Sequence, residues 1–157
     1  MSQSLGVKGR KGFTLVELAV VIVIIGVLAA FGVPRFLKSV ERAKAAEAFS
    51  YLSAVRAAQE RYSAQQGTYT TNLSDLDIQF AAPTYFTVAN PVAGSTSSLE
   101  NSWSQTLTRV GPSSGYGAYT VTFTDQGYDP VNSTIQALPD INPMGNTGAT
   151  SSTGSGT

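Results

Sequence analysis

The sequence predicts an α+β fold, in which a long N-terminal helix packs against a C-terminal antiparallel sheet of about four strands. Two observations lead to this prediction. Helical periodicity runs without a break over residues 13–66, apolar in its first half and amphipathic in its second. After Gly67, a helix stop, the pattern changes to short alternating stretches separated by Gly, Pro, Ser and Thr. The apolar face of such a sheet needs a cover, and the amphipathic half of the helix supplies one.

The first half of the helix is expected to lie in a membrane or inside an assembly. Between residues 13 and 33, only Thr14 and Glu17 are neither apolar nor small. These 21 residues span about 32 Å as an α-helix, close to the roughly 30 Å of a bilayer core. The rest of the chain is too small to surround a helix that is apolar on every side.

Pro34 is expected to kink this helix, because proline lacks an N–H and crowds the carbonyl one turn earlier. Gly26 and Gly32 weaken the same stretch. Beyond the proline, the helix is predicted to bury one stripe whose members recur mostly at spacings of three and four. The stripe consists of Leu37, Val40, Ala48, Phe49, Leu52, Val55, Ala58 and Tyr62.

Four regions follow from these patterns. They are a leader (1–12), an apolar helix half (13–36), a globular domain (37–144) and a flexible tail without large apolar residues (145–157). The domain is predicted to contain the amphipathic helix (37–66), a loop region (67–103), and a sheet and C-terminal region (104–144).

Strands are predicted over residues 84–89, 104–110 and 118–125, and residues 133–138 are a candidate for a fourth. The clearest is 118–125, where Tyr119, Val121 and Phe123 share one face and threonines the other. The sequence leaves open whether apolar packing, prolines or a metal holds the C-terminal region in place: the candidates for packing are Ile135, Leu138 and Ile141.

Composition excludes several kinds of active site. The chain has ten basic and ten acidic residues, no Cys and no His. Disulfides, Cys or His metal sites, and Ser–His or Cys–His nucleophile pairs are therefore excluded. Asp125 and Asp129, on either side of Gly127, do not match an EF-hand loop and are expected to lie in a solvated turn. We expect no enzymatic activity, cofactor or metal, and the balanced charge does not indicate nucleic acid binding.

The stretch "KGFTLVEL" resembles the N-terminus of the type IV pilin superfamily, which includes pilins and type II secretion pseudopilins. The family pattern is a short basic leader that ends in glycine, then phenylalanine, and then glutamate at the fifth position of the mature chain. Gly12, Phe13 and Glu17 match it, and Pro34 follows the apolar stretch as it often does in the family. The basic residues of the leader are Lys8, Arg10 and Lys11.

This resemblance implies the precursor of a filament subunit. A prepilin peptidase would cleave after Gly12 and N-methylate Phe13. The chain would sit in the bacterial inner membrane as a single pass with a cytoplasmic N-terminus, in contact with lipid. It would then polymerise through its N-terminal helix at an inner-membrane assembly platform, forming a homo-oligomeric helical filament that becomes an extracellular pilus or spans the periplasm.

Physical chemistry suggests a role for Glu17 in that assembly. An ionised carboxylate within an apolar membrane segment costs several kcal/mol unless it is paired. Cleavage would create an α-amino group on Phe13, and this cation can approach Glu17 of a neighbouring subunit. At about 4 Å and an effective dielectric near 20, the attraction is roughly 4 kcal/mol before desolvation. The alternative is that Glu17 lies among lipid headgroups and plays no part.

Other functions stay open. The filament can be a type IV pilus or a type II secretion pseudopilus, and the sequence does not separate the two. A membrane-anchored enzyme or binding protein with an uncleaved anchor is a third possibility. A secretory signal peptide cut before Ala30 is disfavoured, because Glu17 would lie inside its apolar region and the helical pattern continues past the cut.

Overall fold

The computed structural model describes residues 12–145 and confirms the predicted α+β fold. The described residues form two compact units, one ending at Phe36 and the other beginning at Leu37. The leader up to Lys11 and the tail from residue 146 lie outside the described residues. The elements are α1 (Leu15–Gln66), η1 (Leu73–Asp75), β1 (Phe86–Val88), β2 (Val92–Ala93), β3 (Trp103–Arg109), β4 (Thr120–Thr124), β5 (Gly127–Tyr128) and η2 (Thr134–Ala137).

The unit that ends at Phe36 is a helix whose described side chains are all exposed. Helix α1 begins at Leu15 and continues through Gly26, Gly32 and Pro34. Its apolar part reaches a mean hydropathy of 2.8 over 18 residues, so its length and composition are sufficient to cross a membrane. The kink at Pro34 stays a prediction.

The second unit has its core where the amphipathic part of α1 meets the sheet. The helix buries Glu41, Ala45, Ala48, Phe49, Tyr51, Leu52, Val55, Ala58 and Gln59. The predicted stripe is therefore confirmed from Ala48 to Ala58. Leu37 was wrongly included: its side chain is 41% exposed, because burial along the helix begins one turn later at Glu41.

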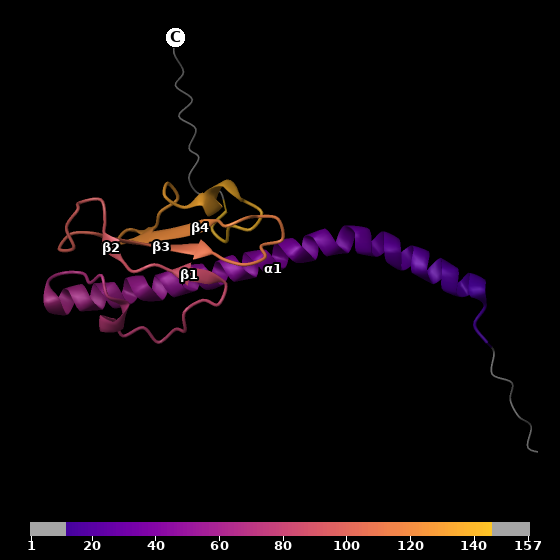
Figure 1. The fold of residues 1–157 in the computed structure, drawn as a ribbon, viewed down its shortest axis with the longest axis horizontal. Coiled ribbons are helices and arrows are strands. Elements are labelled where there is room, and N and C mark those ends of the chain that lie inside the picture. Colours follow the sequence, from indigo (N-terminus) through magenta and orange to yellow (C-terminus); the bar gives the residue numbers. More distant parts are fainter. Residues whose placement is uncertain (1–11, 146–157) are drawn as a thin grey trace, which may run out of the picture. The chain divides into compact units, whose positions relative to one another are not determined.

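The sheet is antiparallel, in the order β1-β3-β4-β5, and β2 also pairs with β3. Its central pair is in register with Leu107 opposite Val121. Tyr119, Val121 and Phe123 are buried, as the alternation in 118–125 predicted. Figure 1 shows β3 and β4 lying along the part of α1 that belongs to this unit. The short strands β2 and β5 were not predicted, since two residues carry no alternation.

The candidate strand over residues 133–138 is wrong. This segment contains the 3₁₀ turn η2. It reaches the edge of β4 through side chains: Ser133 Oγ accepts from the Thr122 amide at 2.8 Å, and Thr134 Oγ1 accepts from the Thr120 amide at 2.7 Å. Because these hydroxyls take the place of backbone carbonyls, η2 can turn without leaving the amides of β4 unpaired.

Apolar packing holds the C-terminal region of the domain. Ile135 and Ile141 are fully buried in the same core as α1 and β4, and Leu138 packs against it. Asn142 is also fully buried, and its amide nitrogen donates to Gln136 Oε1 at 3.2 Å and to the Gly145 carbonyl at 2.7 Å. Of the alternatives that the sequence left open, packing by all three candidate residues is therefore present.

Candidate assembly site

The candidate site begins where α1 begins, at Thr14 and Glu17. The amide and the hydroxyl of Thr14 each donate to Glu17 Oε2 at 2.8 Å. In return, the Glu17 amide donates to Thr14 Oγ1 at 3.2 Å. The first amides of a helix have no partner within the helix, and this reciprocal arrangement, a capping box, satisfies two such donors.

The capping box gives Glu17 an intrachain role that the sequence reasoning missed. Thr14 is at the N-cap and Glu17 three residues later, so the S/T-x-x-E signature was present in the sequence. The carboxylate is therefore hydrogen-bonded before any neighbour arrives, through one of its two oxygens. The other oxygen, Oε1, accepts no hydrogen bond from the described residues.

Gly12 and Phe13 precede the helix and are exposed, with Phe13 at 81%. A Cβ built on Gly12 would meet no atom within 4 Å. Any requirement for glycine at this position therefore has to come from a partner, such as the narrow active site of a protease, and not from the fold of the chain. A Cβ built on Gly26 or Gly32 likewise meets no atom within 4 Å among the described residues.

The helix from Leu15 to Val33 exposes apolar side chains on all sides. Leu15 is 85% exposed, and even Val21, among the less exposed of them, reaches 45%. Soluble monomers rarely expose contiguous apolar patches beyond a few hundred Å². A membrane or other copies of the same helix can cover such a surface, with Glu17 as its one ionisable group.

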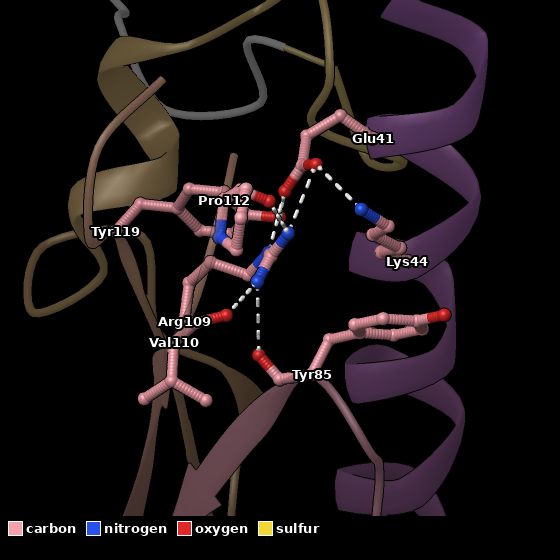
Figure 2. Close-up of polar contacts among 7 residues, drawn as sticks. All are labelled: Glu41, Lys44, Tyr85, Arg109, Val110, Pro112 and Tyr119. Carbon is pink, nitrogen blue, oxygen red and sulfur yellow. Dashed lines mark hydrogen bonds and ion pairs between the residues drawn. The ribbon is translucent and has the colours of Figure 1, made fainter. Parts of the chain in front are cut away.

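The globular unit contains a second polar centre, a buried ion pair between α1 and the end of β3. Arg109 Nε donates to Glu41 Oε1 at 2.6 Å and Nη2 donates to Glu41 Oε2 at 3.2 Å, with both side chains fully buried. Tyr119 Oη also donates to Glu41 Oε1, at 2.9 Å, and Lys44 Nζ lies 3.4 Å from Oε2. Figure 2 shows these groups converging from α1, β3 and the segment before β4.

Arg109 also organises two loops. Its Nη1 donates to the carbonyls of Val110 and Tyr85, and its Nη2 donates to the carbonyl of Pro112 at 2.7 Å (Figure 2). The guanidinium therefore joins the start of β1 and the β3–β4 loop to the helix. A buried arginine needs partners for all its donors, and these contacts supply them.

The buried contacts change the pKa values of Glu41 and Tyr119. Burial acts to raise the pKa of Glu41, but hydrogen bonds from Arg109 and Tyr119 and the charges of Arg109 and Lys44 outweigh it and lower the pKa. Burial and the hydrogen bond to Glu41 raise the pKa of Tyr119 well above its usual range. Glu41 is thus a carboxylate and Tyr119 a neutral phenol at neutral pH.

Sequence reasoning also missed this pair. Glu41 precedes Ala45 by four residues and Ala48 by seven, so it occupied a position on the buried stripe. Arg109 likewise shares the strand phase of Leu107. A charge at each of two buried positions was the available signal for their pairing.

The described residues contain no cluster of three or more Asp, Glu, His or Cys side chains able to hold a metal ion. At the turn expected to be solvated, Asp129 Oδ1 accepts from the amides of Val131 and Asn132 at 3.0 and 3.1 Å. The carboxylate therefore caps its own turn.

Comparison with known proteins bears on the N-terminal segment. A model described as the prokaryotic N-terminal methylation motif matches residues 7–33. The type IV major pilin protein PilA of Myxococcus xanthus is 42% identical over 61 residues, which are 39% of this chain and 28% of that protein. The N-terminal segment carries this motif and is similar to that of type IV pilins. This confirms the resemblance seen in the sequence.

Other pilin-type relatives come from both branches of the superfamily. The type IV narrow pilus major component PilA5 of Thermus thermophilus is 54% identical over 48 residues, 31% of this chain and 41% of that protein. The type II secretion system core protein G of Escherichia coli is 40% identical over 75 residues, 48% of this chain and 52% of that protein. The chain thus spans about half or less of the length of these relatives, which are structural proteins and not enzymes.

Proposed function

We propose that this pilin-type chain is the precursor of a structural subunit that polymerises through its N-terminal helix into a type IV pilus. The observation that supports this most directly is the segment 13–33, which exposes apolar side chains all round and lies within the matched N-terminal methylation motif. A surface of this kind requires either lipid or copies of itself. The chain is held in the inner membrane before assembly and in the filament core afterwards.

Processing precedes assembly in this proposal. A prepilin peptidase cleaves between Gly12 and Phe13 and N-methylates Phe13. The exposed, non-helical position of both residues just before the capping box supports access by a protease. The leader stays on the cytoplasmic side, and an inner-membrane platform extracts the mature subunit into the filament.

Glu17 acts at the extraction step. Thr14 holds its Oε2, which leaves Oε1 for the methylated α-amino group of Phe13 of a neighbouring subunit. The pairing favours the assembled state, because an ion pair costs less in an apolar interior than two isolated charges. It also sets the axial position of one subunit against the next.

Electron microscopy and mass spectrometry of filaments sheared from cells that express the full chain test the proposal. We expect filaments whose subunit begins at methylated Phe13. A subunit that begins at Ala30, or at Met1 within assembled filaments, contradicts the processing. A chain that stays in the membrane uncleaved and never forms filaments supports a membrane-anchored enzyme or binding protein instead.

A type II secretion pseudopilus is the second candidate, favoured by the 40% identity over 75 residues to core protein G. The two differ in where the filament ends. At native expression, a pilus subunit is labelled by antibody on intact cells, whereas a pseudopilus subunit is labelled only after the outer membrane is opened.

A further inference from the structure

Two ionisable side chains of the globular unit have no partner among the described residues, and their charges are opposite. Of the Lys and Arg side chains in residues 37–145, Arg42 alone makes neither an ion pair nor a side-chain hydrogen bond. Of the Asp and Glu side chains in the same described range, Glu100 alone accepts no hydrogen bond. Both are exposed.

These two charges lie at opposite ends of the unit. Arg42 follows Glu41, which binds Arg109 at the last residue of β3. Glu100 follows Leu99, whose carbonyl accepts from the Tyr69 amide at 2.8 Å, just beyond the C-terminal end of α1. The Tyr69 ring in turn packs against Trp103, the first residue of β3.

Helix geometry shows that the two charges cannot meet within one chain. From Arg42 to Gln66, the end of α1, the helix rises about 36 Å. We call the end with Arg42 the base and the end with Glu100 the tip.

Each end also exposes apolar surface beside its charge. At the base, Tyr85 is 43% and Val110 is 42% exposed, and the Val110 amide donates to the Tyr85 carbonyl at 3.0 Å. At the tip, Val92 is 56% exposed and pairs with Ser104 near the start of β3. A contact between the two ends would therefore place the apolar side chains of one end against those of the other, and the Arg42 cation against the Glu100 carboxylate.

Hydrogen bonds tie the backbone at both ends, and a surface that is ordered before docking has less conformational entropy to lose. At the base, Arg109 Nη1 binds the carbonyls of Tyr85 and Val110. At the tip, residues 94–102 form a closed loop: the Gly94 amide donates to the Ser102 carbonyl at 3.1 Å, and the hydroxyls of Thr96 and Ser102 lie 2.6 Å apart.

We infer that the tip of one globular unit docks on the base of the next copy of this chain. A contact between two different surfaces of identical chains closes into a ring or continues as an open helical assembly. A two-fold contact through either end would instead place Arg42 against Arg42 or Glu100 against Glu100. The inference rests on the proposed function, since it supplies the contact between globular units within that filament.

The natural chain has no cysteine, which makes disulfide trapping in assembled filaments a clean test. We expect that V92C/V110C filaments, when oxidised, give a ladder of covalent multimers on non-reducing gels. Each single variant, V92C or V110C, should give none, because one cysteine sits at each end. V110C/V131C is the matched control and should give no ladder. Val131 is 89% exposed, but it lies on the turn capped by Asp129 and not in the tip as defined by Val92 and Glu100.

Charge reversal provides the second measurement. In the V92C/V110C background, R42E or E100R alone should lower the ladder yield about 1.4- to 5-fold, the range expected for an exposed ion pair. R42E/E100R together should restore it, since the pair is re-formed with its signs exchanged.

The outcomes separate this inference from the proposed function. Filaments that assemble but give no ladder from V92C/V110C, or dimers from V110C alone, overturn the tip-to-base contact and leave the proposed function standing. A ladder whose yield is the same in R42E, E100R and the double variant overturns the role of the two charges. A natural chain that forms no filament overturns the proposed function itself.

Discussion

At the scale of single residues, the Glu17 carboxylate combines two properties that can be separated by mutation. Its Oε2 accepts hydrogen bonds from Thr14, and its negative charge is available to a neighbouring amine. Glutamine retains an acceptor oxygen that can complete a capping box, but it carries no charge. Alanine removes both.

We expect Glu17→Gln and Glu17→Ala to be inserted and cleaved normally, because both make the segment more compatible with lipid. Both should assemble poorly, since a buried α-amino group without a counter-charge costs roughly 3–5 kcal/mol. The measurement is filament yield by electron microscopy beside an immunoblot of the cleaved form in membranes. Thr14→Val is the matched control, because it removes the cap hydroxyl and leaves the charge. If E17Q forms filaments at the natural yield, capping and not charge is the role of Glu17.

Glu41 illustrates the different case of a charge that is buried in the finished domain. Its replacement by glutamine leaves Arg109 buried without a full counter-charge, so we expect a loss of roughly 3–5 kcal/mol in the free energy of unfolding. Trp103 is the single tryptophan and is fully buried, so its fluorescence reports unfolding of the full chain in detergent. Glu47→Gln is the control, because Glu47 bonds the Thr84 amide at the surface. Equal stability of E41Q and the natural chain would contradict this expectation.

The pH dependence of stability should follow Glu41. Its pKa is lowered on folding, in the field of Arg109, Lys44 and the Tyr119 hydroxyl. The folded state therefore binds fewer protons, and the stabilisation is complete above the unfolded pKa of about 4.3. It is lost as pH falls through the lower folded value. An acid titration of Trp103 fluorescence should show this loss in the natural chain and a flatter profile in E41Q. Parallel profiles would assign the acid sensitivity to other carboxylates.

At the scale of elements, the sequence was most informative where the periodicity was long. The helix over residues 13–66 was confirmed as Leu15–Gln66, and the strand over 118–125 as β4 within it. The start at Leu15 depends on the Thr14 cap, a local signal that the apolar pattern conceals.

The prediction of a strand over residues 133–138 was wrong for a physical reason. The hydroxyls of Ser133 and Thr134 accept hydrogen bonds from backbone amides of β4, so this segment does not need an extended backbone to pair with the strand. The alternation of side chains in the sequence does not reveal this. The Glu41–Arg109 pair was missed because its members are 68 residues apart, and a charge at a buried position does not by itself identify its partner. Long-range pairing of polar groups is information that one sequence does not display.

At the scale of the whole molecule, the two units differ in what they need from their surroundings. The unit from Leu37 buries its own core, whereas residues 12–36 bury nothing among the described residues. We therefore expect a chain that lacks residues 1–36 to be a soluble folded monomer. Circular dichroism, sedimentation and Trp103 emission would measure this. Aggregation of the truncated chain would mean that the apolar half contributes to folding of the domain.

The hydroxyl contacts along the edge of β4 have a further consequence for a protein that is concentrated in a filament. An open strand edge presents unpaired amides that any extended segment of another chain can join, and this is a common route to amyloid-like association. Subunits crowded at a point of assembly meet at very high local concentration, where such strand pairing would compete with ordered growth. Ser133 and Thr134 occupy the amides of Thr122 and Thr120 with side-chain oxygens, which cannot propagate a sheet. Side chains of the same chain thereby protect this edge of the domain from pairing with a strand of another subunit.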